Sequence, residues 1–171
     1  KVTGGRGSRR ANPAMLDRKH PAHGILHGDG PTIIFLTVCT KNRDRWLANA
    51  PVHDLLCRCW READAWIVGR YVIMPDHIHL FASPGQTYRP LENWVRYWKS
   101  LFTKWHREPE HRWQTDHWDT RVRSWESYDD KWKYVRGNPV RHGLVCETDD
   151  WPYQGELNEL RWDLYSCSSG D

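Results

Sequence analysis

The sequence predicts an α+β fold, in which a split antiparallel sheet is built in the order β-α-β-β-α-β and is followed by one more helix. Three observations support this fold class. Short runs of β-branched and aromatic residues recur along the chain. Longer stretches between them carry apolar residues at intervals of three and four, as amphipathic helices do. The length of 171 residues fits one domain with a core of its own.

The first half of the chain contains three predicted strands and one helix. Residues 32–40 (TIIFLTVCT) are a β-branched apolar run that predicts a strand. Residues 52–65 carry apolar side chains at helical spacing. Residues 66–74 (WIVGRYVIM) predict the second strand, and residues 77–82 (HIHLFA) predict a third strand that pairs with it in a hairpin.

The second half contains two predicted helices separated by a strand. Residues 91–107 repeat apolar side chains at helical spacing, and residues 113–122 predict the fourth strand. Ser127 is the predicted N-cap of the last helix, because two aspartates follow it in what would be the first turn. This helix carries Tyr134. The complete order is that of a ferredoxin-like split sheet with an additional C-terminal helix.

The folded domain is predicted to span residues 31–153. Residues 1–30 are rich in Gly, Arg, His and Pro and lack apolar periodicity, so we interpret them as a flexible basic N-terminal arm. Residues 154–171 form a C-terminal extension. The stretch 151–165 is expected to form an extra helix or a lid.

Composition restricts the class of protein further. No apolar run approaches the ~18 residues of a membrane span, so we expect a cytoplasmic protein without a membrane partner. The five cysteines have no zinc-finger spacing and are expected to be reduced. The formal net charge of +3 is a weak signal for nucleic acid by itself.

The distribution of positive charge is more informative than its sum. Residues 88–107 interleave tyrosine and tryptophan with arginine and lysine. Cationic side chains follow phosphates, and aromatic rings stack on unpaired bases, although most of the 12 tryptophans are expected in the core. The candidate DNA-binding residues from this and a later segment are Arg96, Lys99, Lys104, Arg136, Arg141 and His142.

His77 and His79 are the strongest candidates for metal ligands. Residues two apart on a strand point to the same face, so both imidazoles should lie side by side while Ile78 packs on the other face. Such a pair is a natural metal-binding element. The plain alternative is that they are ordinary surface histidines.

Tyr134 and Asn138 form a second candidate pair. They are four residues apart and therefore share a face of a helix, which Gly137 and Pro139 weaken. If that face covers the sheet, Asn138 can reach the histidines. The plain alternative places the Tyr134 ring in the core and makes Asn138 a helix-end residue.

Two segments of the sequence resemble the HUH-type single-tyrosine transposases, and most of all the REP-associated tyrosine transposases. Residues 74–80 read MPDHIHL and residues 134–144 read YVRGNPVRHGL. The resemblance extends over roughly residues 31–153. It implies that His77, His79 and Asn138 hold Mg²⁺ or Mn²⁺ and that Tyr134 is the nucleophile.

The resemblance also implies a function. The protein would cleave and rejoin single-stranded DNA hairpin ends through a 5′-phosphotyrosine intermediate, as a monomer or a homodimer. A domesticated single-stranded DNA-binding protein that does not cleave is the alternative. A two-histidine phosphoesterase would need two H-x-[ST] motifs, and a zinc deaminase would need H-x-E with P-C-x-x-C. The sequence contains neither set.

Overall fold

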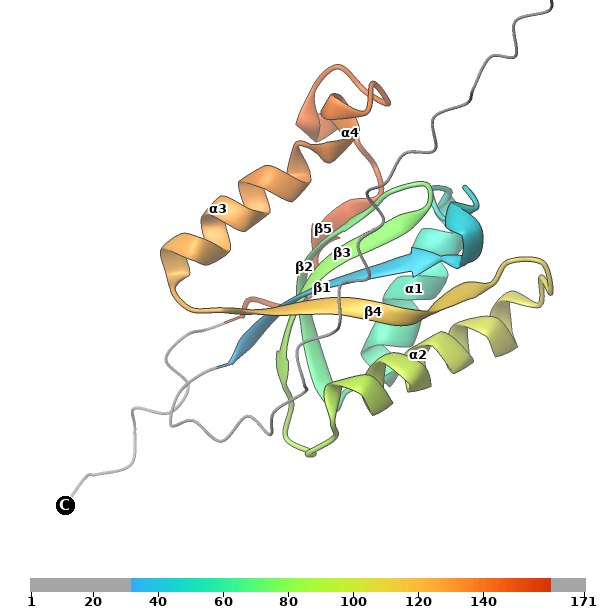
Figure 1. Cartoon of the computed structure of the whole chain (residues 1–171), viewed down its shortest axis with the longest axis vertical. Coiled ribbons are helices and arrows are strands. Elements are labelled where there is room, and N and C mark those ends of the chain that lie inside the picture. The colour runs from blue at the N-terminus through green and yellow to red at the C-terminus, as the bar shows by residue number, and fades with distance from the viewer. Residues whose placement is uncertain (1–31, 161–171) are drawn as a thin grey trace, which may run out of the picture.

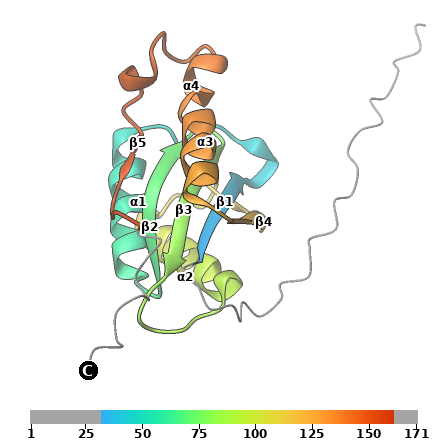
Figure 2. The ribbon, with the colours of Figure 1, turned by 90° about the vertical axis from the view of Figure 1, so that its left-hand side faces the viewer.

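The computed structural model describes residues 32–160, and its centre is one antiparallel sheet of five strands in the order β4-β1-β3-β2-β5. Figure 2 shows the strands side by side in this order. The expected N-terminal arm and the end of the C-terminal extension lie outside the described residues.

The elements follow the predicted sequence order, with one additional strand at the end. Their bounds are β1 Ile33–Thr40, α1 Ala50–Glu62, β2 Trp66–Ile73, β3 His77–Pro84, α2 Leu91–His106, β4 Trp113–Val122, α3 Trp125–Arg136, α4 Asn138–Arg141 and β5 Gln154–Glu156. The α+β class and the antiparallel sheet are therefore confirmed.

The two helices α1 and α2 cover one face of the sheet. Both follow a strand and return to the sheet two positions away, and right-handed crossovers of this kind place their helices on the same side. Ile78 and Leu80 of β3 pack there against Trp94, Trp98 and Phe102 of α2, all with 0% exposure. This cluster is the main hydrophobic core.

The opposite face is covered by α3 (Figure 1). Tyr128 and Val135 on this helix pack against Phe81 and Val72 in a second, smaller cluster. The ring centroids of Phe81 and Tyr128 lie 4.5 Å apart. Because strand side chains alternate, this face receives the residues that the main core does not.

The structure corrects the predicted start of the last helix. The N-cap is Ser124, whose side-chain oxygen accepts a hydrogen bond of 3.1 Å from the backbone N–H of Ser127. Ser127 therefore lies inside the first turn of α3. Both serines are acceptable caps, and the end of β4 at Val122 decides between them by fixing where the chain turns.

The extra helix expected after residue 151 is wrong for its described part. A 3₁₀ turn at Thr148–Asp150 is followed by β5, which pairs with β2 and extends the sheet past the expected domain boundary at residue 153. Trp151 is buried and its indole N–H donates to the carbonyl of Ile73 at 3.0 Å. Contacts with β2 thus fix this segment as part of the sheet edge.

Two expectations from composition can be examined within residues 32–160. Cys39, Cys57, Cys59 and Cys146 are free thiols, while Cys167 lies outside the described residues. No helix in this part of the chain combines the length and the apolar character that crossing a membrane requires.

Candidate active site

His77 and His79 lie side by side on the sheet face that α3 covers. In the strand register His77 is opposite Cys39 and His79 is opposite Thr37 on β1. Ile78, between them, is fully buried in the other core. The two imidazole centroids are 4.7 Å apart and the rings are nearly perpendicular, at 80°. The structure thus places both histidines on one face, as the strand alternation predicts.

The hydrogen bonds of the two rings leave the same nitrogen available on each. His77 Nδ1 lies 2.7 Å from Asp76 Oδ1, and His79 Nδ1 lies 2.9 Å from Thr37 Oγ1. Neither Nε2 atom has a hydrogen-bond partner among the described residues. A protonated Nδ1 that donates to an oxygen fixes the tautomer in which the Nε2 lone pair can bind a metal.

Arg43 supports this arrangement from the turn that follows β1. Its Nε atom forms an ion pair with Asp76 Oδ2 at 2.9 Å, and Nη1 donates to Cys39 Sγ at 2.7 Å. Arg43 Nη2 also approaches His77 Nδ1, at 3.3 Å. That contact competes with the shorter one from Asp76. We assign the Nδ1 proton to the Asp76 interaction, because the carboxylate is nearer and can only accept.

Burial keeps both imidazoles neutral. It lowers the pKa of His79 to about 3, and electrostatic interactions with His77, Arg43 and Arg141 act in the same direction. Burial also lowers the pKa of His77, although the hydrogen bond and charge of Asp76 oppose this effect. Neutral imidazoles are the form that binds a metal, so at neutral pH both are ready for that role.

Tyr134 lies at the surface in the last turn of α3. Its exposure of 66% excludes the alternative in which the ring belongs to the core. Gly137 separates α3 from the short α4, which begins at Asn138, and Asn138 is buried with 7% exposure. The break around Gly137 and Pro139 that the sequence suggests is therefore present.

Arg141 connects the two candidate residues at this break. Its guanidinium carbon lies 4.2 Å from the centroid of the Tyr134 ring, and Nη2 donates to the carbonyl of Tyr134 and to Oδ1 of Asn138. The side chain supplies a donor to a carbonyl near the end of α3, where helical donors run out.

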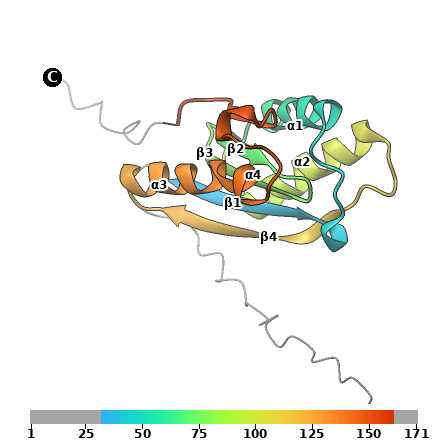
Figure 3. The same ribbon diagram turned by 90° about the horizontal axis from the view of Figure 1, so that it is seen from above.

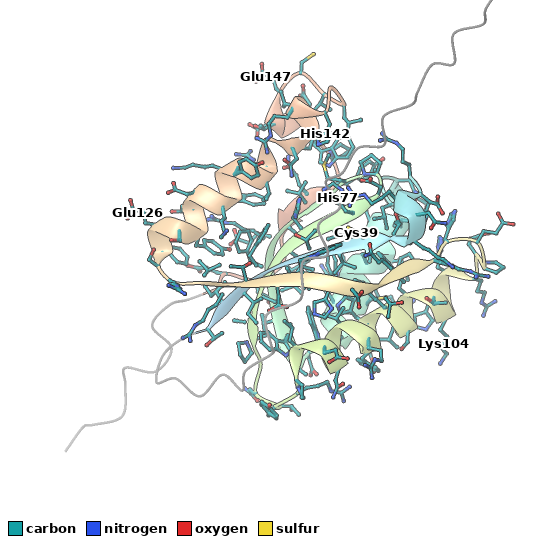
Figure 4. The ribbon with its side chains drawn as sticks, viewed as in Figure 1. Cys39, His77, Lys104, Glu126, His142 and Glu147 are labelled. Atoms are coloured by element: carbon teal, nitrogen blue, oxygen red, sulfur yellow. The ribbon has the colours of Figure 1, made fainter. Side chains whose placement is uncertain are left out.

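The end of α4 lies close to the histidine pair. The charge of Arg141 contributes to the low pKa of His79, after burial and the larger effects of His77 and Arg43, and the charge of His142 contributes to that of His77. Figure 4 shows His142 above His77. The structure therefore brings Arg141 and His142 of the second motif close to the histidine pair of the first, although the second motif begins 55 residues after His79.

The candidate DNA-binding residues divide between the two faces. Arg141 and His142 lie close enough to the histidines for their charges to act on His79 and His77. Arg136 pairs with Asp149 and lies instead in a pocket that Arg70 and Glu156 also line, on the side of β2 and β5. Arg96 and Lys104 are exposed on α2, across the sheet from the histidines (Figure 4).

Lys99 does not reach the surface as a phosphate ligand would. It is 9% exposed, and its ammonium group donates to the carbonyls of Gln114 and Thr115 at 2.8 and 3.4 Å. Burial lowers its pKa to about 8. The expected stretch of aromatic and basic residues on α2 is therefore largely a core-forming element.

Three further residues belong to this site. Asp76 directly precedes His77, a position from which the sequence allows it either to cap the turn or to orient the imidazole, and in the structure its carboxylate contacts His77 and pairs with Arg43. Arg43 is 34 residues from His77 and had no local signal. Trp118 is 42% exposed opposite Thr37, on the same face as His79. Alternation along 113–122 could have indicated its face, but not its neighbours.

The donor atoms fit a divalent metal with oxygen and nitrogen ligands. Two neutral imidazoles and an amide oxygen suit Mg²⁺ or Mn²⁺ when water and phosphate oxygens complete the coordination. Within residues 32–160 no group of three His, Cys, Asp or Glu side chains could hold a metal ion. A metal at this position therefore depends on the amide of Asn138, whose Oδ1 accepts a hydrogen bond from Arg141 and has a second lone pair for a metal.

Comparisons with known proteins agree with the resemblance seen in the sequence. No protein-family model matches the chain. A REP-associated tyrosine transposase of Escherichia coli K12 is 28% identical over 105 residues, covering 61% of this chain and 59% of the relative. A Haemophilus influenzae relative described in the same terms is 26% identical over 106 residues, covering 54% of this chain and 60% of the relative. The similarity to REP-associated tyrosine transposases is thus confirmed over about three fifths of their length.

The fold is also that of a solved relative. The structure of a REP-associated tyrosine transposase bound to a REP hairpin matches with a TM-score of 0.63 and 24% identity. The match covers 72% of this chain and 75% of the other.

Proposed function

We propose that this protein is a metal-dependent transposase or endonuclease that cleaves and rejoins single-stranded DNA at hairpin ends. The observation that carries the proposal is the convergence of two motifs. His77 and His79 have free Nε2 atoms, and Arg141 and His142 of the segment that carries Tyr134 and Asn138 lie close enough to act on them electrostatically. Relatives that are REP-associated tyrosine transposases, one of them solved with a REP hairpin, support the same substrate class.

Tyr134 is the proposed nucleophile. Its hydroxyl oxygen attacks the scissile phosphorus and forms the new P–O bond, while the bond from phosphorus to the 3′ oxygen breaks. The tyrosine releases its proton to solvent, and the departing 3′ oxygen takes one up to become a 3′-OH. The product is a 5′-phosphotyrosine link to DNA.

The link retains the energy of the phosphodiester bond. A 3′-OH of another strand can therefore attack the phosphotyrosine, form a new phosphodiester and release the Tyr134 hydroxyl. No nucleotide cofactor is required for this exchange.

His77, His79 and Asn138 would hold Mg²⁺ or Mn²⁺. When bound, the metal would polarise the scissile phosphate and offset the charge that develops during attack. The protein's own contribution is to keep both imidazoles neutral and oriented, through Asp76 and Thr37. Arg141, which lies against the Tyr134 ring, is placed to attract the phosphate.

A direct test is a covalent capture experiment. A fluorescein-labelled DNA hairpin with single-stranded flanks is incubated with the protein and Mg²⁺ or Mn²⁺, and a denaturing gel separates free DNA from protein-linked DNA. We expect a shifted band that requires metal and that a protease removes. Absence of the band for hairpins of varied flanking sequence, together with intact binding, would contradict the cleavage proposal.

The non-cleaving DNA-binding protein is the second candidate. One observation favours it: Asn138 Oδ1, the proposed third metal ligand, accepts a hydrogen bond from Arg141, whose positive charge repels a cation at this position. Such a protein would bind the labelled hairpin and never form the covalent band. In either case we expect hairpins with unpaired flanks to bind more tightly than a blunt duplex of the same sequence at equal salt.

The remaining expectations stay predictions. They concern the cytoplasmic location and the choice between a monomer and a homodimer. Size-exclusion chromatography with light scattering, with and without the hairpin, distinguishes the two assembly states.

A further inference from the structure

Trp118 is an exposed tryptophan on the sheet face that carries the histidine pair. It belongs to neither hydrophobic cluster. It lies on β4 at the edge of the sheet, with 42% exposure. Most other tryptophans in the described part of the chain are buried or packed against the core, as Trp94 and Trp98 are. A large exposed indole at the rim of a candidate site points to a binding role.

The strand register connects Trp118 to the site. Thr37 of β1 is opposite Trp118 on one side and opposite His79 on the other, so the three residues form a row across β4, β1 and β3. Residues directly opposite in an antiparallel pair share a face. Thr37 is also the hydrogen-bond partner of His79 Nδ1. The indole is therefore about two strand spacings, roughly 10 Å, from His79 along one sheet face.

The surface beside this row is aromatic and basic. The Phe35 ring stacks on His79, with centroids 5.4 Å apart and an interplanar angle of 19°. Lys131 of α3 places its ammonium group 5.3 Å from the Phe35 centroid, and it forms no ion pair with the described residues. Seen from above, β4 runs along the edge of the sheet, with its C-terminal end beside α3 and the rest of the strand extending beyond that helix (Figure 3). We call Trp118, Phe35 and Lys131 the β4 shelf.

We propose that the β4 shelf holds the DNA strand next to the scissile phosphate, with an unpaired base stacked on Trp118. This inference rests on the proposed function, because it takes the phosphate to lie at the histidine pair. A base is favoured over an apolar protein segment because the shelf carries a cation, Lys131, that complements a phosphate. Flat aromatic rings next to cations are the usual elements of single-strand binding sites.

A coupling experiment between protein and DNA tests the stacking directly. All proteins carry Tyr134→Phe so that binding is measured without cleavage. The probe is a fluorescein-labelled hairpin with single-stranded flanks, and a series of probes has one abasic site at each flank position in turn. Trp118→Ala should weaken binding of the intact probe about tenfold, or about 1.4 kcal/mol.

In the protein that retains Trp118, an abasic site at one flank position should weaken binding to a similar degree. In Trp118→Ala the same abasic site should have no further effect, because both changes remove the same stacking interaction. Trp118→Phe should retain most of the affinity, since it keeps a ring. Tyr88→Ala removes an aromatic residue that is 81% exposed outside the shelf and should leave affinity unchanged. Thermal melting verifies that each variant folds.

Unchanged affinity in Trp118→Ala, or additive losses at every abasic position, would overturn the shelf. Loss of self-association with unchanged affinity for DNA would overturn it too, and would assign Trp118 to an interface between copies of the chain. The coupling requires no covalent chemistry. A protein with intact Tyr134 that shows the coupling but never forms a covalent band would therefore retain the shelf and lose the proposed cleavage activity.

Discussion

The sheet face under α1 and α2 and the face that carries His77 and His79 are built from alternate residues of the same strands, but they are covered to different degrees. Under α1 and α2, Trp94, Trp98 and Phe102 are fully buried, and even the amine of Lys99 is held inside. On the other face α3 covers part of the sheet, and polar side chains remain next to its uncovered edge. One face therefore stabilises the fold, and the other leaves room for a ligand.

The difference shows that a segment rich in aromatic and basic residues can serve two different roles in this protein. On α2 it builds a core with a charged outer surface. On the opposite face, Trp118, Phe35 and Lys131 lie to one side of a pair of neutral histidines. The helix layer decides which outcome applies, because it determines whether water and a substrate can reach the side chains. Substitutions on the two faces should consequently differ in kind.

The largest expected effect is that of Tyr134→Phe on the open face. Formation of the covalent protein–DNA band should fall by at least about 10³-fold, because no phosphotyrosine can form without the hydroxyl. Stability and DNA affinity should be unchanged, since the residue is 66% exposed. The measurement is band yield against time at saturating hairpin.

Tyr128→Phe is the matched control for this prediction. Tyr128 is fully buried on the same helix, its hydroxyl has no hydrogen-bond partner within the described residues, and burial raises its pKa to about 12. Its replacement should leave band formation intact. A metal-dependent band that persists in Tyr134→Phe would assign the nucleophile to another residue.

His77→Ala and His79→Ala should reduce cleavage to background while DNA affinity stays within about threefold, because each removes a proposed metal ligand from a surface that other side chains still form. Excess chelator should have the same effect on the unmodified protein. His106→Ala, at the end of α2 beside His111, is the control and should remain active. Full activity of either site variant, or of the chelated protein, would exclude the metal role.

Substitutions on the face covered by α1 and α2 should change the stability of the protein rather than its activity. Lys99 allows a pH-dependent test of this expectation. Its pKa is lowered by burial from 10.5 to about 8, so between these values the unfolded chain binds a proton that the folded chain has released. The free energy of unfolding should therefore gain a contribution from Lys99 as pH rises from 8 to 10.5, and this contribution is absent below pH 8.

Urea denaturation of the unmodified protein and of Lys99→Met at about pH 7.5 and about pH 9.5 measures this contribution. The thiols titrate in both proteins, so the difference between the two pH dependences reports Lys99 together with its charge interaction with Cys39. The curve of Lys99→Met should rise less, or fall more, with pH. Parallel curves would show that the amine titrates normally.

The smallest expected effect belongs to the outer surface of α2. Lys104→Gln and Arg96→Gln should change hairpin affinity less than about twofold and leave its salt dependence unaltered, because both residues lie across the sheet from the site. Arg141→Gln, at the site, is the matched comparison and should weaken binding. A shallower salt dependence in the α2 variants would place DNA on the covered face as well.

Local sequence patterns were sufficient for most of the scaffold and for the two motifs. The predicted fourth strand, 113–122, coincides with β4, and alternation alone places His77 and His79 together. Right-handed crossover connections put α1 and α2 on the same face, opposite the histidines. This argument could have separated Arg96 and Lys104 from the site without a structure.

Other features depend on contacts that local patterns do not contain. Strand β5 has three residues, too few for a periodic signal, and its position is set by pairing with β2. Arg43 reaches Asp76 from a turn far away in the sequence. Lys99 lies at the border of the apolar stripe of α2, where periodicity does not decide between a buried and an exposed side chain.

The break at Gly137 restricts how many residues can separate Tyr134 from Asn138. One inserted or deleted residue in a helix turns the following side chains by about 100° and shifts them by about 1.5 Å. Tyr134 and Asn138 would then no longer be joined by Arg141. A Cβ atom at Gly137 would come within 2.7 Å of Arg141 Nη1, but this atom is the far end of a flexible side chain that can shift. In this segment changes of chain length should therefore be tolerated less well than changes of residue type.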